Sequence, residues 1–257
     1  MSLPAMTIII SVITTTLLIA SIACGSQLQI GSPKVQYIVT NNANHTLGGA
    51  RFNKQIGPST AAQILYSATN FTWAVFDQAN NPLDRKNITS ITLLIEDRGV
   101  NNGSTTAAAA AQTNKTTIHV SANYIGNYAA NLRRQFSGII YQEVAAIWQW
   151  NGKGQAPAGL VTGIAHYVRL QARYGTVEKV KPGDGDRWDQ GGGVTARFLV
   201  YCNQLKKGFV GQINKKMRHG YTDGFFLDLL GKPVDHLWSN YKERYGLEAR
   251  THRRHHE

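Results

Sequence analysis

The chain is poor in cysteine and in acidic side chains. It has two cysteines, Cys24 and Cys202, and 15 aspartates and glutamates against 27 lysines and arginines, which gives a formal net charge of +12 over 257 residues. So few cysteines exclude a small scaffold held together by disulfides. We expect Cys202 to be a small buried hydrophobic residue in a helix.

Long hydrophobic runs are also missing. The apolar stretch from Thr7 to Ala23 is too short and too rich in threonine for a membrane span, and it has the position and the small-residue end of a secretory signal. We predict a signal peptide over residues 1–25, cleavage near Ser26 and no stable membrane span afterwards. An uncleaved anchor is the alternative, because no lysine or arginine precedes the run.

The chain as a whole has the composition of a globular protein, with 42% hydrophobic and 16% charged residues. We predict one domain over residues 26–246 and a polar tail, rich in His and Arg, over residues 247–257. The densest basic cluster is formed by Lys206, Lys207, Lys215, Lys216 and Arg218.

This basic charge has two interpretations. A basic secreted protein is attracted to polyanions such as acidic polysaccharides, whereas a solvated helix face would carry the same lysines without a partner. No aromatic or glycine-rich nucleic-acid motif accompanies the cluster, so we expect no specific nucleic-acid partner. The residues do not predict an oligomeric state.

Acceptor sites for N-linked glycans crowd the first half of the chain. Asn-x-Ser/Thr sequons occur at Asn44, Asn70, Asn87, Asn102 and Asn114. Their clustering is an independent argument for secretion, and it predicts an N-terminal half whose loops face solvent.

Residue patterns divide the chain into a strand-rich half and a helical half, which is an α+β organisation. A helix from Arg51 to Tyr66 interrupts the strands, with Gly57-Pro58-Ser59 as its start signal. Two helices are expected later, from about Tyr128 to Trp150 and from Pro157 to Tyr174. The expected strands are Val35–Val39, Phe71–Phe76, Ile91–Ile95 and Thr117–Val120.

The two later helices each carry a distinctive face. In the first, Phe136, Ile140, Val144 and Ile147 recur at helical spacing and predict a core face. In the second, helical geometry aligns Thr162, His166 and Arg169 in one stripe. The opposite face of the first helix is small or polar, as is typical of a helix that lines a cleft; it carries Gln135, Gly138, Gln142, Ala146 and Gln149.

The blocks Y-Q-E-V-A-A-I-W-Q-W-N-G, G-I-A-H-Y-V-R-L and D-R-W-D-Q lie between Gly138 and Tyr245. Through them the chain resembles the plant basic secretory protein family, which consists of zincin-like metallopeptidases. The resemblance implies a twisted, mainly antiparallel sheet packed on a helical C-terminal half, with an active-site cleft between them. We expect Trp150, Trp188 and Arg169 to line this cleft.

The family usually has H-E-M-T-H where this chain has Q-E-V-A-A, and E-G-I-A-D where it has T-G-I-A-H. The histidines of an H-E-x-x-H helix lie one turn apart and bind one zinc ion, while the glutamate activates the zinc-bound water. Here Gln142 and Ala146 replace the histidines, and Thr162 and His166 replace the two acidic residues. Glu143 keeps the general-base position.

Zinc in a catalytic site needs three protein ligands, but a glutamine amide is a poor ligand and alanine is none. We therefore expect no cofactor, a vestigial ligand position at His166, and a structural role for Glu143, including an ion pair with Arg169. The leading interpretation is a secreted, non-catalytic metallopeptidase homologue. It would bind a peptide or an acidic polysaccharide in the apoplast or cell wall, and the resemblance implies a defence role.

Two alternatives stay open. The first is an active zinc peptidase with a non-standard site, in which His166, Glu143 and a third, unidentified residue hold the metal. The second is a polyanion-binding protein in which the cleft plays no part. Zinc content distinguishes the first from the leading interpretation, and salt-dependent retention on an acidic polysaccharide identifies the second.

Overall fold

A computed structural model describes residues 35–97, 111–175 and 180–254. The predicted signal peptide and the sequon at Asn102 lie outside the described residues. None of the helices in the described part combines the length and apolar composition needed to cross a membrane.

The N-terminal half contains a four-stranded sheet in the order β1-β2-β4-β3. Strands β1 (Gln36–Asn41), β2 (Ser90–Glu96) and β4 (Thr117–Ser121) are parallel to one another, and only β3 (Ala111–Asn114) runs antiparallel, as a hairpin with β4. The prediction of a mainly antiparallel sheet is therefore wrong.

The connection between the first two strands explains this difference. Residues Phe71–Phe76, predicted as a strand, form the end of helix α2 (Gly57–Val75), where Leu65, Ala68 and Thr72 are buried at helical spacing. Together with α1 (Leu47–Gln55), this helix carries the chain from the end of β1 back to the start of β2, so the two strands pair in parallel.

The predicted helix from Arg51 to Tyr66 is two helices. α1 ends at Gln55 and α2 begins at Gly57, whose φ of 74° breaks the helical path between them. Pro58 then occupies the first turn of α2, where its missing N–H group costs nothing. The start signal at Gly57 is thus correct, although a second helix precedes it.

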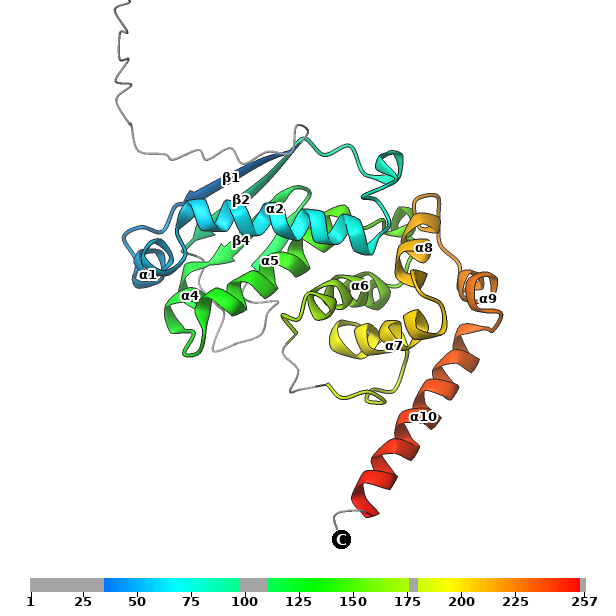
Figure 1. Cartoon of the computed structure of the whole chain (residues 1–257). Coiled ribbons are helices and arrows are strands. Elements are labelled where there is room, and N and C mark those ends of the chain that lie inside the picture. The colour runs from blue at the N-terminus through cyan, green and yellow to red at the C-terminus, as the bar shows by residue number, and fades with distance from the viewer. Residues whose placement is uncertain (1–34, 98–110, 176–179, 255–257) are drawn as a thin grey trace, which may run out of the picture.

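The C-terminal half is helical, as predicted, and the α+β class is confirmed. Figure 1 shows α6 beside α7 and α10 extending away from the body of the molecule. Helix α10 continues to Arg254, so the predicted tail begins as helix. The remaining elements are η1 (Pro82–Asp84), α4 (Ala122–Asn127), α5 (Leu132–Trp148), η2 (Gly152–Gly154), α6 (Ala158–Gln171), α7 (Gly192–Leu205), α8 (Phe209–Lys216), α9 (Gly224–Leu230) and α10 (Val234–Arg254).

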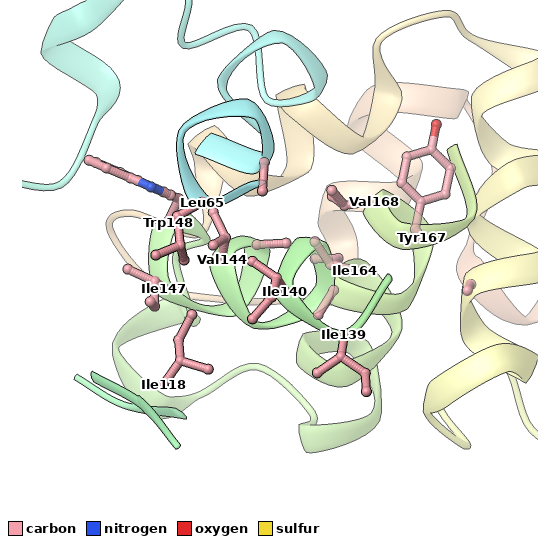
Figure 2. Packing of buried hydrophobic residues seen from close by; sticks show 14 of the residues in the cluster. Leu65, Ile118, Ile139, Ile140, Val144, Ile147, Trp148, Ile164, Tyr167 and Val168 are labelled. Atoms are coloured by element: carbon pink, nitrogen blue, oxygen red, sulfur yellow. The ribbon is translucent and has the colours of Figure 1, made fainter. Parts of the chain in front are cut away.

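Helix α5 lies at the centre of the core. Its predicted core face is confirmed, because Phe136, Ile140, Val144 and Ile147 are all buried. Figure 2 shows this helix between Ile118 of β4 and the apolar side chains of α6. α5 therefore joins the sheet layer to the helical half and carries Glu143 between them. Cys202 is fully buried in α7, as predicted.

Candidate functional site

The candidate site lies where α5 and α6 pack against each other. The two helices run in opposite directions: Gln142 contacts Arg169 near one end, while Gln149 donates a hydrogen bond of 3.0 Å to the carbonyl of Val161 near the other. Ala146, which is half-buried, lies on α5 between these two contacts. The polar face predicted for α5 therefore does meet α6.

Arg169 is the centre of this contact and is only 3% exposed. Its Nη1 donates to Oε1 of Gln142 (3.3 Å), its Nη2 donates to Oε1 of Gln135 (3.2 Å), and its Nε donates to the carbonyl of Tyr174 (3.0 Å). The Nε2 of Gln135 in turn donates to the hydroxyl of Tyr124 (2.8 Å). A buried guanidinium with several oriented acceptors rigidly fixes the positions of both helices.

Gly138 creates the space that this guanidinium needs. A Cβ atom at position 138 would lie 2.9 Å from Nε of Arg169 and 3.0 Å from both Cβ and the carbonyl oxygen of Tyr174. At these separations the side chain of Arg169 and the backbone of Tyr174 would have to move to admit a methyl group. The glycine one turn before Gln142 is thus a requirement of the Arg169 network.

Glu143 is buried beside the same network. The Nε2 of Gln142 lies 3.4 Å from its Oε1 and donates to it. Burial lowers the pKa of Arg169, and the charge of Glu143 is among the groups that oppose this shift. The carboxylate therefore acts on the buried cation electrostatically, and its structural role stays a prediction.

Thr162 and His166 face the start of α7. The hydroxyl of Thr162 donates to carbonyls of its own helix and accepts weakly from the amide of Gly192 (3.4 Å), while the ring of His166 lies near the position that a Cβ of Gly192 would take. His166 and Arg169 line a hollow of about 160 Å³ together with Arg197 on α7.

Burial, and secondarily the charge of Arg169, lower the pKa of His166 to about 4, so this imidazole is neutral at physiological pH. None of the described side chains that line the hollow is a carboxylate. The hollow is consequently basic in composition and large enough for one small polar group.

Comparison with known proteins identifies the relatives of this chain. The model of a family described as a peptidase of plants and bacteria matches residues 32–241. The chain belongs to this family. A protein named basic secretory protease from Boswellia serrata is 41% identical over 59 residues, which are 23% of this chain and 67% of that protein. No solved structure matches the chain.

Within this peptidase family, the ligand positions expected from the H-E-x-x-H pattern do not fit a zinc ion here. The amide oxygen of Gln142 already accepts from Arg169, and Ala146 offers no donor atom. The described ranges, 35–97, 111–175 and 180–254, hold no group of three or more His, Cys, Asp or Glu residues able to bind a metal ion. A fixed guanidinium beside position 142 would also repel a divalent cation.

The two tryptophans predicted to line the cleft lie elsewhere. Trp188 is buried against Phe226, with ring centroids 5.2 Å apart, and belongs to the aromatic core. Trp150 follows the end of α5 and donates its indole N–H to the carbonyl of Asp84 (3.0 Å). Neither residue lines the hollow beside His166.

The predicted basic cluster is partly neutralised by acidic neighbours. Lys215 forms an ion pair of 2.8 Å with Asp84, and Lys216 forms one of 3.0 Å with Asp228. Arg218 also lies 3.8 Å from Asp84. Lys206 and Lys207 form no ion pair with another described residue, so the cluster offers less free charge than its sequence suggests.

The sequons differ in their surroundings. Asn44 and Asn87 are exposed, but Asn70 lies inside α2, half-buried, and the threonine of its sequon, Thr72, is fully buried. Asn70 therefore does not belong to a solvent-facing loop, because it lies within helix α2. Asn114 belongs to β3.

Two contributors to this arrangement, Tyr124 and Arg197, are absent from the sequence-based prediction. Tyr124 and Gln135 position Arg169 from a distance in the chain, and Arg197 completes the hollow from α7. Gln135 does appear on the predicted polar face of α5, which is a usable signal. Nothing in the sequence indicates that Tyr124 or Arg197 lies near Arg169, because their positions depend on how the helices pack.

Proposed function

We propose that the protein is a secreted, non-catalytic member of the peptidase family. In this proposal the site serves as a binding surface in the extracellular space, in the apoplast or cell wall, with the defence role that the family resemblance implies. The observation that carries the proposal is the hydrogen bond from Arg169 to Gln142. It commits the first ligand position of the family to a buried cation, and Ala146 leaves the second without a donor.

Peptide hydrolysis by this family's pattern needs a metal-bound water for the glutamate to activate. Glu143 is retained, but it lies against Gln142 and acts on Arg169, which suits a structural carboxylate. The alternative of an active enzyme requires His166, Glu143 and a third residue to hold a metal together. The packing of His166 against α7 argues against it.

The composition of the hollow supports an anionic ligand group. His166, Arg169 and Arg197 supply nitrogen donors, and the size suits a single carboxylate. We infer that the group is the C-terminal carboxylate of a peptide or the carboxylate of an acidic polysaccharide. A peptide with a free C-terminus should bind more tightly than its amidated form, and Arg197→Gln should abolish this difference. Equal binding of both peptides would reject the carboxylate assignment.

Zinc content tests the proposed loss of catalysis. The mature protein, with the tail histidines His252, His255 and His256 changed to Ala to remove incidental metal binding, should hold no stoichiometric zinc and cleave no peptide. One zinc ion per chain that survives dialysis against a mild chelator would refute the proposal and favour an active enzyme.

A restoration experiment distinguishes lost ligands from a lost scaffold. Changing Gln142 and Ala146 to His, together with His166→Asp, should recover zinc binding if the two helices keep the family's geometry. A further Glu143→Gln change should then spare the metal and abolish any recovered hydrolysis. The matched control carries the single change Ala146→His, which should not bind zinc.

A further inference from the structure

A second cavity, of about 600 Å³, lies away from the His166 hollow and shares no lining residue with it. It lies beneath the chain from Pro82 to Thr89, between Trp73 of α2 and Trp148 at the end of α5. Figure 2 shows Trp148 projecting from α5 on the side away from Tyr167 and Val168 of α6. The volume is within the range typical of sites for small organic ligands.

Among the described residues, two cations in the cavity wall have no acidic partner. Arg85 donates from Nε to the carbonyl of Gln78 (2.7 Å) and from Nη2 to the carbonyl of Ala79 (3.0 Å), and Lys86 donates from Nζ to the carbonyl of Ile147 (2.8 Å). Within the described part of the chain neither cation forms an ion pair. The adjacent carboxylate of Asp84 is already paired with Lys215, at 2.8 Å.

The burial of Lys86 makes this missing partner significant. Burial lowers the pKa of its ammonium group to about 8. An ammonium has three N–H donors, and the described residues supply one acceptor. Lys86 is half-buried and its Nζ also lies 5.6 Å from the centre of the Trp150 ring, so water reaches part of the charge and an anion can approach it. A bound anion would supply both the missing charge and the missing acceptors.

Most of the rest of the wall is apolar, and Asn87 and Thr89 are its uncharged polar residues. The guanidinium of Arg85 lies 3.8 Å above the ring of Trp73, and the rings of Trp73 and Trp148 meet edge to face at 5.0 Å. The indole nitrogens of both tryptophans are fully buried, so these residues present ring surface to the cavity and not their N–H groups. Leu83, at the rim, is 88% exposed. The wall thus combines aromatic and aliphatic surface with the two cations Arg85 and Lys86.

We propose that this cavity binds a small organic anion that carries an apolar ring or chain. The carboxylate or sulfonate of the ligand would lie against Lys86 and Arg85, and its apolar body would cover Trp73 and Leu83. The sequon asparagine Asn87 also lines the cavity. The site is independent of the proposed non-catalytic function, because it involves none of the residues around Glu143 and His166.

Two fluorescent probes that differ only in charge test the proposal on the full mature chain. Anilinonaphthalene sulfonate carries a sulfonate, whereas phenylnaphthylamine has the same ring system without it. Lys86→Met keeps the aliphatic part of the side chain and removes the charge. It should weaken binding of the sulfonate probe by about tenfold or more and leave the neutral probe within about twofold, because hydrogen bonds to charged groups are strong.

Lys207→Met is the matched control, since Lys207 is exposed and does not line the cavity; it should change neither probe. Leu83→Asp should weaken both probes if the ligand body covers Leu83. Unchanged binding of the sulfonate probe to Lys86→Met, or an equal effect of Lys207→Met, would overturn the proposal.

If Lys86→Met fails to fold, the affinity of the unaltered protein for both probes, measured over a series of pH values, still tests the proposal. Affinity for the sulfonate probe should fall as the pH rises through about 8, while affinity for the neutral probe should not. The charged groups near Lys86 are its chain neighbours Arg85 and Asp84, Lys215, which pairs with Asp84, and, across the ring of Trp150, Arg218. Lys86→Gln should flatten the series, and a sulfonate affinity independent of pH would reject the role of Lys86.

Discussion

For the substitution Gly138→Ala, helix propensity and the contacts in this structure predict opposite changes in stability. Alanine is favoured over glycine inside a helix by about 1 kcal/mol, so helix propensity alone predicts a more stable protein. In this structure the new methyl group would lie 2.9 Å from Nε of Arg169 and 3.0 Å from the carbonyl oxygen of Tyr174. Those two atoms are joined by a hydrogen bond from the buried guanidinium, which the methyl group would force apart.

The expected cost exceeds the gain in propensity. A hydrogen bond to a charged group contributes about 1.5–3 kcal/mol, and overpacking a well-packed contact costs about 1–3 kcal/mol. Allowing for overlap between these two effects, we expect Gly138→Ala to lose about 2 kcal/mol or more of unfolding free energy. For a domain of this size the midpoint temperature should fall by roughly 4–8 °C.

Thermal or urea unfolding measures this effect, and the chain offers a matched control. Gly246 lies in α10, and a Cβ atom there would have no neighbour within 4 Å. Gly246→Ala should therefore leave stability unchanged or raise it by up to about 1 kcal/mol. If the Gly138→Ala protein is as stable as the unaltered one, the close approach of Arg169 to α5 is refuted. The explanation of how Arg169 fixes α5 against α6 then fails as well.

Three further predictions concern charge and secretion. The pKa of His166 is lowered to about 4, below its unfolded value of about 6.5. The stability that this residue contributes is therefore intact above about pH 6.5 and falls as the pH drops toward 4. In unfolding measured over a pH series, His166→Gln should reduce this pH dependence. Reversing Lys206 and Lys207 to Glu should reduce retention on a pectate column at low salt, and unchanged retention would exclude the basic cluster as the binding surface. The mature protein should begin near Ser26 and lose mass on deglycosylation, with Asn87→Gln removing part of that loss; a full-length, unglycosylated product would contradict secretion.

Local patterns were sufficient for much of the helical half. The spacing of Phe136, Ile140, Val144 and Ile147 correctly predicts both the helix and its buried face, because an apolar stripe at helical spacing has few other uses. The apolar run Phe71–Phe76, by contrast, was wrongly predicted to be a strand. It is too short for periodicity to separate a strand from the end of a buried helix.

The arrangement of the site depends on contacts that no local pattern encodes. The sequence pattern predicts that Gln142, Ala146, Thr162 and His166 converge, but among the hydrogen bonds of the described residues Arg169 is the member of the α6 stripe that contacts polar side chains of α5. The pattern does not reveal that Arg169 turns toward Gln142 and Gln135 while His166 turns toward α7, because this depends on the rotation of α6 between its two neighbours. The parallel pairing of β1 with β2 is similarly a property of the connection between them.

That parallel pairing has a consequence for how the chain folds. Joining Gln36 to Ser90 closes a loop of roughly fifty residues, and such distant pairing is slower than forming a hairpin such as β3–β4. During synthesis β1 emerges first, and its buried apolar side chains Tyr37 and Val39 have no strand to join until β2 follows. We expect nascent or truncated chains that end before Ser90 to be the aggregation-prone species, so that the period of greatest risk ends when β2 leaves the ribosome.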